Sequence, residues 1–494
     1  MPTATDTTAT IGRNTTDDSS VAVVSLYKKQ IKIYPRAVRG WFASWRWALV
    51  WATQLVFYGL PWLTWNDRPT VLFDLAARRF FIGPLVLYPQ DFIYLTGLLI
   101  LSAYALFLFT AVAGRLWCGY ACPQTVYTEL FMWVEHHLEG DRAARMKLDA
   151  APWSVNKLLR KGGKQAIWLL MGLFTGFTFV GYFTPIHTLA QEAATSLGLA
   201  AGTVGLGPWE TFWILFYGFA TYGNAGYMRE QVCKYMCPYA RFQSAMFDKD
   251  TLIVSYDGKR GEPRGSRPRS ADPKALGKGD CIDCGLCVQV CPTGIDIRNG
   301  LQYECIGCAA CVDVCNGVME KMNYPPGLIR LDTQNSMAQG WSRAQVLGRI
   351  FRPRVLIYSA VLLLIGGAFI ASLLTRTPFR VDVVRDRGTL ARVVDEGSIE
   401  NVYRLQVMNA REVDASFRVS VAGLNGLKVV SEPDVTVPAT QSRWLPVRVQ
   451  LPFAAAAALS PAAYPVEFLI ESVSTDREIP RQVVHEKSTF VLPR

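Results

Sequence analysis

The stretch CIDCGLCVQVCP at residues 281–292 holds four cysteines separated by gaps of two, two and three residues. The stretch CIGCAACVDVCN at residues 305–316 repeats that spacing. This run is typical of bacterial ferredoxins, in which three cysteines bind one 4Fe–4S cluster and the fourth binds the neighbouring cluster. The two predicted ligand sets are Cys281, Cys284, Cys287 and Cys315 for one cluster, and Cys305, Cys308, Cys311 and Cys291 for the other.

The doubled pattern also narrows the choice of metal. Zinc is the alternative for paired cysteines, but eight cysteines at ferredoxin spacing favour iron–sulfur clusters. Small residues at Gly285, Ala309 and Ala310 leave room for backbone N–H groups near the sulfurs. Asn316 departs from the ferredoxin pattern, because it stands where the second run should have proline. That position is not a ligand, so we expect the cluster to persist with a different local geometry.

The composition indicates an integral membrane protein. Of 494 residues, 50% are hydrophobic and only 18% are charged, whereas soluble chains carry about a quarter charged residues. These values exclude a disordered chain, and the length excludes a small scaffold held together by disulfides. Five apolar stretches are about 20 residues long, which is enough to cross a bilayer, so we predict a bundle of five transmembrane helices. They are Trp47–Trp65, Phe92–Gly114, Ala166–His187, Trp209–Met228 and Val355–Leu374.

Lysine and arginine counts alternate along the chain and predict its orientation. Residues 1–46, 115–164 and 229–354 hold seven, eight and 18 of them, whereas residues 66–90 hold three and residues 188–208 none. Basic segments stay in the cytoplasm of bacteria, so the N-terminus and all twelve cysteines are predicted to be cytoplasmic and the tail periplasmic. We expect the chain to lie in the inner membrane. The basic cytoplasmic segments account for the net charge of +11, so we expect no nucleic-acid binding. The first 20 residues are polar, and we expect them to be a disordered head without a cleaved signal peptide.

A second pair of motifs lies where predicted spans reach the cytoplasm. They read WCGYACP at residues 117–123 and VCKYMCP at residues 232–238. Each places two cysteines one helical turn apart, followed by a proline that ends or kinks the helix. Soft thiolates select Cu(I), zinc or iron–sulfur centres. One four-sulfur site, two two-sulfur sites and buried structural thiols all remain open for Cys118, Cys122, Cys233 and Cys237.

Other donors lie close to these motifs in sequence. Thioethers that suit Cu(I) are offered by Met228, Met236 and Met246. His136 and His137 follow the first motif, and a solvated or interfacial helix face is their simpler interpretation. His187 ends the third predicted span and is expected to be interfacial, with a metal or quinone site as the alternative.

Two further segments are distinct in composition. Residues 257–280 are rich in Gly, Pro and Arg, which predicts a linker that lies on the anionic leaflet, clamps the clusters, or docks an acidic electron donor. Residues 377–494 hold alternating apolar runs at 402–407, 417–421 and 445–449, separated by turn residues. Such runs predict an antiparallel all-β sandwich. Pro446 within the third run indicates an edge strand or a strand start.

Together these motifs resemble the FixG/RdxA/CcoG family, accessory proteins of the cbb-type cytochrome c oxidase. The resemblance covers about residues 25–494 and rests on GRLWCGYACPQTVYTE, EQVCKYMCPYARFQSAM, DGKRGEPRG and the double ferredoxin run. It implies an immunoglobulin-like tail and a membrane-bound cupric reductase, which converts Cu(II) to Cu(I) for the haem–copper centre of the oxidase. In this resemblance Cys118, Cys122, Cys233 and Cys237 match motifs proposed to handle copper, and the eight ferredoxin cysteines match the cluster ligands.

Two other functions remain open, namely a quinol-oxidising electron-transfer subunit of the NapH type and a redox-sensing assembly scaffold without turnover. The sequence has no glycine-rich nucleotide-binding loop, so the electron donor is expected to be a cytoplasmic protein or a quinol. Further expected partners are membrane lipid, a copper chaperone or copper-transporting ATPase, oxidase assembly factors and a second copy of the chain. The predicted segments are 1–46 (cytoplasmic), 47–254 (four spans with the Cys-x3-Cys-Pro motifs), 255–345 (linker and ferredoxin-like α+β domain), 346–376 (fifth span) and 377–494 (periplasmic sandwich).

Overall fold

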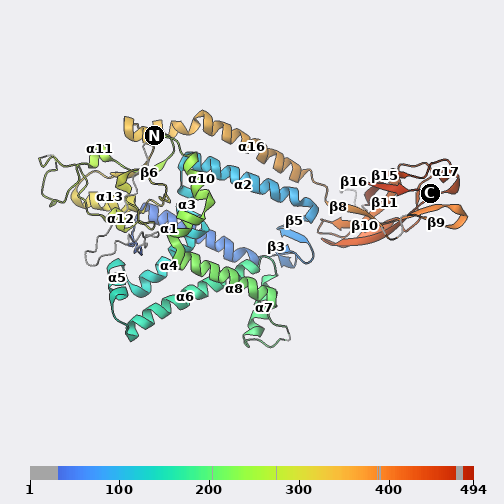
Figure 1. Cartoon of the computed structure of the whole chain (residues 1–494), viewed down its shortest axis with the longest axis horizontal. Helices are drawn as coiled ribbons and strands as arrows, with labels where there is room; N and C mark the ends of the chain where they lie inside the picture. The colour runs from blue at the N-terminus through green and yellow to red at the C-terminus, as the bar shows by residue number, and fades with distance from the viewer. Residues whose placement is uncertain are drawn as a thin grey trace, which may run out of the picture.

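The computed structural model describes residues 32–493, apart from residues 203, 274, 387, 389, 390 and 474–481. The polar head predicted for the first 20 residues lies outside this range. Three parts follow one another along the long axis: a domain of loops and short helices, a group of long helices and a β-sandwich (Figure 1). The long helices therefore separate the cysteine-rich domain from the sandwich.

Two helices are long and apolar enough to cross a membrane within the described residues. One comprises a short 3₁₀ turn and α2 (Phe92–Ala113), and the other is α16 (Pro353–Leu374). Both agree with the expected spans to within three residues at each end. They pack side by side, because Gly97 on α2 lets Phe369 approach and the Tyr94 hydroxyl donates to the Ser372 carbonyl at 3.2 Å.

Two of the other three expected spans differ in their bounds from the helices that form. The first is α1 (Trp41–Gly59), which begins before the predicted start and ends ahead of Pro61. The third is α6 (Val155–Val180), whose first turns are basic, and the fourth is α8 (Pro208–Gly223), which is only 16 residues long. Its predicted end lies in a π-helical turn at Asn224–Met228. The bounds predicted for the first and third spans were wrong, whereas those of the fourth agree to within one residue with α8 and its π-helical turn taken together. A five-helix bundle stays a prediction.

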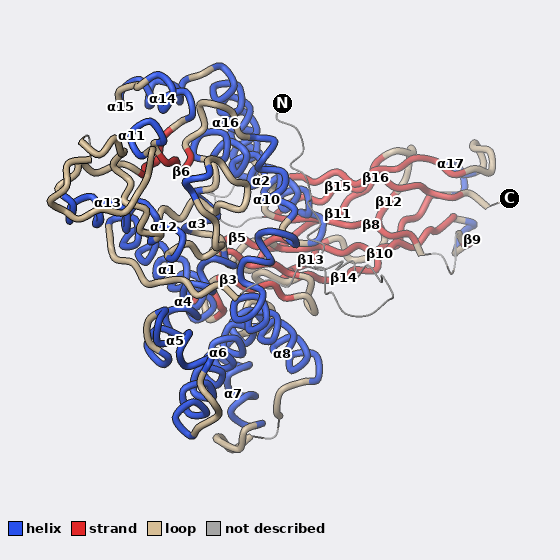
Figure 2. Tube along the Cα trace, turned by 60° about the vertical axis from the view of Figure 1, so that its left-hand side comes forward, coloured by secondary structure: helices blue, strands red, loops and turns tan. Residues whose placement is uncertain are grey.

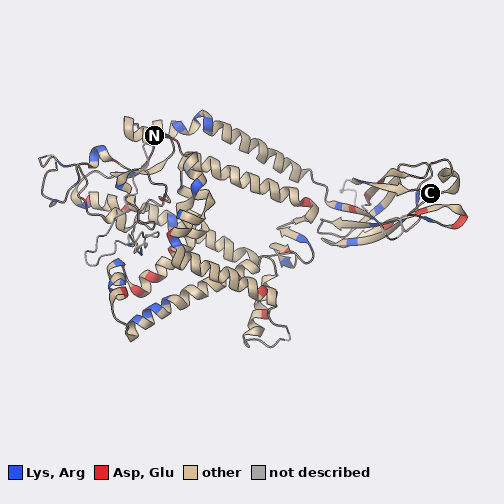
Figure 3. Cartoon of the chain, viewed as in Figure 1, with Lys and Arg blue, Asp and Glu red and all other residues tan. Residues whose placement is uncertain are grey.

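Glycines allow α6 and α8 to approach closely. A Cβ added at Gly176 would lie 2.2 Å from the Ile214 carbonyl oxygen, and one at Gly172 would lie 2.6 Å from that of Gly218. Gly172 and Gly176 form a small-xxx-small pair, which is typical of helices that pack inside a bilayer. Figure 3 shows Lys and Arg gathered at the helix ends next to the cysteine-rich domain, while the middle of α2 and α16 carries none.

The cysteine-rich domain is closed by a two-stranded antiparallel sheet. Strand β6 (Ile253–Tyr256) pairs with β7 (Ile329–Asp332), and the two cysteine runs lie between them in sequence. Helices α12 (Leu286–Gln289) and α13 (Ala310–Met322) pack on this sheet around Val254. Short helices complete the region: α11 (Gly258–Gly261), α14 (Gln334–Gln339) and α15 (Arg343–Gly348).

The domain is also tied to the first long helix. The Asp313 carboxylate on α13 accepts hydrogen bonds from the backbone N–H groups of Phe42 at 3.2 Å and Ala43 at 2.8 Å. These N–H groups belong to the first turn of α1 and have no partner within that helix. A carboxylate at this position caps the helix and also complements its dipole. The cluster domain thus fixes the N-terminal end of α1 in space.

The tail is a β-sandwich of two antiparallel sheets, seen as the red strands of Figure 2. One sheet has the order β12-β14-β10-β8, and β9 also pairs with β10. The other has the order β13-β11-β15-β16. Their bounds are β8 (Phe379–Arg385), β9 (Arg392–Val393), β10 (Ile399–Asn409), β11 (Ala415–Ala422), β12 (Lys428–Val429), β13 (Asp434–Val437), β14 (Ser442–Leu451), β15 (Ala463–Val473) and β16 (Val483–Val491). The predicted all-β tail is therefore correct.

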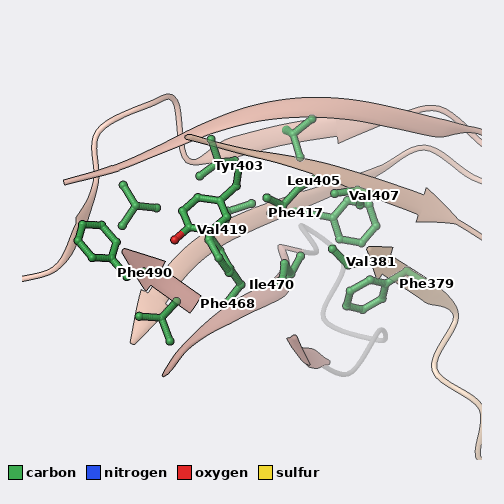
Figure 4. Close-up of a cluster of buried hydrophobic side chains, with 14 of the residues drawn as sticks. Phe379, Val381, Tyr403, Leu405, Val407, Phe417, Val419, Phe468, Ile470 and Phe490 are labelled. Atoms are coloured by element: carbon green, nitrogen blue, oxygen red, sulfur yellow. The ribbon is translucent and has the colours of Figure 1, made fainter. Parts of the chain in front are cut away.

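Aromatic side chains from both sheets fill the sandwich core. Tyr403 and Phe468 lie edge to face with ring centroids 4.8 Å apart, and Phe417 is also fully buried (Figure 4). Pro446 lies in β14, an inner strand of the sheet, but at a point where one side of that strand has no neighbour, so the expected edge position holds locally. The proline is tolerated because the short β12 pairs only with Val449 and Gln450, which leaves that side of Pro446 without a ladder partner.

A small three-stranded sheet joins the helices to the sandwich. It consists of β3 (Val71–Asp74), β4 (Arg79–Ile82) and β5 (Leu85–Leu87), and the hairpin β1 (Thr64–Trp65) and β2 (Arg68–Pro69) precedes it. At the junction Asp91 is fully buried and forms ion pairs with Arg376 and Arg380. Buried charges need such pairing, so these contacts fix the sandwich to the start of α2.

Candidate metal centres

The cysteines of the first predicted cluster line one small cavity. Cys281, Cys284, Cys287 and Cys315 surround it together with the side chain of Arg298. The loop curls because Asp283 and Gly285 have left-handed backbone φ values of 53° and 64°. The fourth member, Cys315, comes from α13, the helix in which the second run ends, as the ferredoxin pattern predicts.

The cysteines of the second predicted cluster line a neighbouring cavity. Cys291, Cys305, Cys308 and Cys311 border it, and Cys287 of the first set lies between the two cavities. Gly307 and Ala309 take left-handed φ values of 71° and 56°, which curl this loop in the same way. Two groups of four soft thiols around adjacent cavities fit two 4Fe–4S clusters in chemistry and arrangement. Their role as the actual ligands stays a prediction.

The linker between the helices and the clusters folds over the first cysteine loop. The Gly265 N–H donates to the Cys281 carbonyl at 3.1 Å, and the Arg267 guanidinium donates to the same oxygen at 3.5 Å. Arg260 forms an ion pair with Asp280. Of the alternatives left open by the sequence, this packing favours a clamp over the cluster. Asn316, which replaces the second proline, accepts a hydrogen bond from the Gly327 N–H at 2.8 Å and so anchors the exit of the loop.

Each Cys-x3-Cys-Pro motif forms a break between two helices. Cys118 lies on α3 (Leu116–Tyr120), and Cys122 precedes α4 (Pro123–Glu139) with extended backbone. Cys233 lies on a π-helical turn, and Cys237 precedes α10 (Pro238–Met246) in the same extended conformation. The proline begins a new helix, where its missing N–H costs nothing and its ring keeps the preceding cysteine out of helical backbone. The expected placement of both thiols on one continuous helix was therefore wrong.

The two motifs meet in space although they lie far apart in the chain. Burial, together with the neighbouring Cys122 and Cys237, raises the pKa of the Cys118 thiol to about 11, although the Gln243 hydrogen bond opposes this. Burial likewise raises the pKa of Cys233 to about 12, with additional contributions from the other three thiols. The four thiols are thus electrostatic neighbours, which favours one shared group over two separate pairs. Within the described part of the chain, no three His, Cys, Asp or Glu residues are close enough together to hold a single ion.

The four-thiol group lies directly against the second cysteine loop. A Cβ added at Gly119 would lie 2.9 Å from the Cα and N atoms of Cys308 and from the Ile306 carbonyl oxygen. The Tyr120 hydroxyl donates to the Cys308 carbonyl at 3.4 Å. Cys118 and Cys233 pack on the buried cluster formed by Ile306 and Cys308. Helix α3 therefore links the four-thiol group to a predicted cluster ligand by backbone contact.

Three residues at this junction were missed by the sequence analysis. Gln243 is fully buried and its amide lies 3.5 Å from the Cys118 sulfur. Gly119 supplies the close approach described above. Arg46 is buried on α1, forms an ion pair with Glu129 at 3.1 Å, and lines a small cavity together with Cys308. A lone arginine in an apolar helix is a signal of function that the sequence does contain, but the predicted span began one residue after it.

The other candidate donors are not brought to the four-thiol group. Met228 and Met236 are exposed, and the Met246 sulfur accepts a hydrogen bond from Arg354 at 3.7 Å. His136 and His137 are exposed at the end of α4, as the simpler interpretation expects. His187, on α7 (Ile186–Ser196), packs edge to face on Trp62 with ring centroids 5.3 Å apart, which agrees with an interfacial position.

Three protein-family models match the chain. One, described as a 4Fe-4S dicluster domain, covers residues 228–334. A second, described as a 4Fe-4S binding domain, covers residues 95–139, and a third, described as the IG-like fold at the C-terminal of FixG, covers residues 369–493. These matches confirm the iron–sulfur character of the cysteine-rich region and the immunoglobulin-like fold of the tail.

Relatives with assigned names match most of the chain. It is 37% identical to the nitrogen fixation protein FixG of Rhizobium meliloti over 453 residues, covering 85% of this chain and 84% of that protein. It is 40% identical to RdxB of Cereibacter sphaeroides, covering 85% and 88%, and 39% identical to RdxA of the same organism, covering 82% and 85%. The crystal structure of a FixG-related protein from Vibrio parahaemolyticus matches 24% of this chain and 97% of that chain at 22% identity and a TM-score of 0.20. The chain therefore belongs to the FixG/RdxA/RdxB family, as its motifs indicated.

Proposed function

We propose that this protein is a membrane-bound iron–sulfur oxidoreductase that reduces Cu(II) to Cu(I) during assembly of cbb-type cytochrome c oxidase. The observation that carries the proposal is the meeting of both Cys-x3-Cys-Pro motifs in one half-buried group against the Cys308 loop. Substrate copper would bind at this group. The resemblance to copper-handling members of the family supports the choice of metal.

The four thiols suit the product, Cu(I), better than the substrate, Cu(II). Thiolates are soft ligands and prefer Cu(I), so binding itself favours the reduction of Cu(II). Because burial raises the pKa of the Cys118 and Cys233 thiols, a metal must displace their protons when it binds. When bound, the two iron–sulfur clusters supply one-electron transfer to this site. Gly119 holds α3 against the cluster loop, and Gln243 orients the Cys118 sulfur.

The proposed topology places the clusters and four thiols in the cytoplasm and the sandwich in the periplasm. Support comes from the basic residues gathered at the cluster end of the helices and from the sandwich lying at the far end (Figure 3). Large apolar side chains are also exposed along α1, α2, α8 and α16, and soluble proteins rarely expose so many together. A cytoplasmic copper chaperone or a copper-transporting ATPase would then receive Cu(I), with oxidase assembly factors as further partners.

One observation favours a second candidate. The family model described as a 4Fe-4S binding domain covers Cys118 and Cys122 rather than the ferredoxin runs. Under this alternative the four thiols bind a third iron–sulfur cluster, and the chain passes electrons from a quinol to another protein without handling copper. Four thiols from two loops satisfy the ligand count of either centre.

Metal analysis and copper reduction together separate the two candidates. The full chain, purified in detergent without oxygen and reconstituted, should hold about eight irons and eight acid-labile sulfides. After reduction with dithionite and desalting, added Cu(II) should restore the bleached cluster absorbance, and a Cu(I)-specific chelator should report one Cu(I) per electron. About twelve irons together with no response to Cu(II) would replace the copper proposal by the third-cluster alternative.

A further inference from the structure

A large cavity lies beside the end of the first cysteine loop and contains none of the twelve cysteines in its wall. Its volume is about 680 Å³, and it lies between the segment before α1, α1 itself and α4. Sites for small organic ligands and cofactors have volumes of this order, roughly 300–1,000 Å³. One wall consists of Val290 and Pro292, which flank the predicted ligand Cys291. A molecule in the cavity therefore lies next to the second cluster.

We propose that this cavity binds a membrane quinol, which serves as the electron donor to the clusters. The inference rests on the proposed function in requiring that the clusters receive electrons, but it does not depend on copper as the acceptor. It names the donor class that the sequence left open between a protein and a quinol.

The walls of the cavity match a flat aromatic ring that carries two hydroxyl groups. Trp47, Trp51 and Trp133 contribute aromatic surface, and Leu130 and Met132 add aliphatic surface. Aromatic residues at a membrane interface commonly bury the apolar part of the ring and leave its polar edge in water. Trp51 and Trp133 are exposed in this way. A lipid-soluble tail can leave along α1, where further large apolar side chains are exposed.

The polar groups of the cavity are placed to handle the quinol oxygens. Arg46 is 6% exposed, and its Nε has no hydrogen-bond partner among the described residues. Arg46 borders the cavity, and its guanidinium carries five N–H donors, of which those at the cavity wall can donate to a ligand oxygen. Glu129 accepts from Arg46 Nη2 at 3.1 Å, and its carboxylate has further acceptor positions for a hydroxyl proton. The rim carries His136 and His137, which face water.

Oxidation of the hydroquinone in this cavity balances in electrons and protons. The two O–H bonds of the hydroquinone break and its ring becomes a quinone, which releases two protons and two electrons. The protons leave through Glu129 and the histidine rim to the cytoplasm, and the electrons reduce the two 4Fe–4S clusters by one electron each. Arg46 also lies beside Cys308 in the wall of a small cavity, and a cation at that point favours the more negative, reduced cluster.

The test uses the reconstituted full chain in detergent with duroquinol as reductant and an azidoquinone as photolabel. Duroquinol should bleach the cluster absorbance of the parent protein, and the photolabel should map to peptides from α1 and α4. Arg46→Gln, which removes the guanidinium, should slow reduction by duroquinol about tenfold or more. Ser44→Trp, which fills the cavity from an exposed position on α1, should do the same and abolish labelling.

A matched control keeps the result specific. Ser102 is also an exposed helical serine whose hydroxyl donates to the carbonyl four residues before it, as that of Ser44 does, so Ser102→Trp should behave like the parent. Dithionite must still bleach all variants, which shows that their clusters are intact. The inference is overturned if duroquinol leaves the parent clusters oxidised, if Ser44→Trp is reduced at the parent rate, or if a phospholipid alone protects the cavity from labelling. Reoxidation of dithionite-reduced protein by Cu(II) tests the proposed function separately from these outcomes.

Discussion

Replacement of Gly119 by alanine should uncouple the four-thiol group from the second cluster loop. The added Cβ would lie 2.9 Å from two backbone atoms of Cys308 and from the Ile306 carbonyl oxygen. Ordinary van der Waals contact begins near 3.4 Å, so α3 and the loop must separate by about 0.5 Å. Backbone atoms cannot rotate away as a flexible side chain can, and such overpacking costs about 1–3 kcal/mol.

The separation should slow copper reduction more than it affects metal content. Small displacements of a reacting group cost up to roughly 100-fold in rate, so we expect Gly119→Ala to reduce Cu(II) about 10- to 100-fold more slowly than the parent. The assay is stopped-flow reoxidation of the dithionite-reduced, desalted protein by Cu(II), followed at the cluster absorbance. Iron content should remain at the parent value, because no cysteine is changed.

Gly162 on α6 supplies the matched control. It is also a helical glycine, but a Cβ added there meets nothing within 4 Å. Both substitutions gain about 1 kcal/mol of helix propensity, so only the clash distinguishes them. Gly162→Ala should therefore equal or exceed the parent in stability and match its rate. A Gly119→Ala protein that reduces copper at the parent rate would refute the argument that this contact positions the thiol group.

Three further outcomes are expected. Cys122→Ala or Cys237→Ala should keep the iron content but weaken Cu(I) binding and slow Cu(II) reduction. Cells that carry either variant should have low oxidase activity, which added copper partly restores. Unchanged copper binding would show that the thiols are structural. A reporter that is active only in the periplasm should work when fused at the C-terminus and stay silent when fused near Gly261, and the reverse pattern would overturn the topology. Asp313→Ala should lower stability toward denaturant by about 1–2 kcal/mol through loss of the α1 cap, whereas an unchanged midpoint would show that the cap contributes nothing.

The two predicted cluster sets illustrate how much a local pattern can decide. The gaps between the cysteines allow a loop to curl around one cube and send its fourth thiol to the next, and the structure lines two adjacent cavities with those same groups. The alternation of apolar residues in the tail likewise predicted strands correctly, since a period of two places one face in the core. Span ends agreed less well, because α1 and α6 begin before the apolar stretches, at turns that carry charged residues and give no membrane signal.

By itself the sequence determined the classes of structure in this protein: the cluster-binding loops, the apolar helices and the sandwich. Each depends on spacing between residues that are close together in the chain. Only the tertiary structure decided that Cys118 and Cys233 share one group, that Gly119 contacts the Cys308 loop, and that Arg46 borders a cavity beside the second cluster. These contacts join segments far apart in sequence, and they depend on how helices pack and how buried charges find partners, which no local spacing specifies.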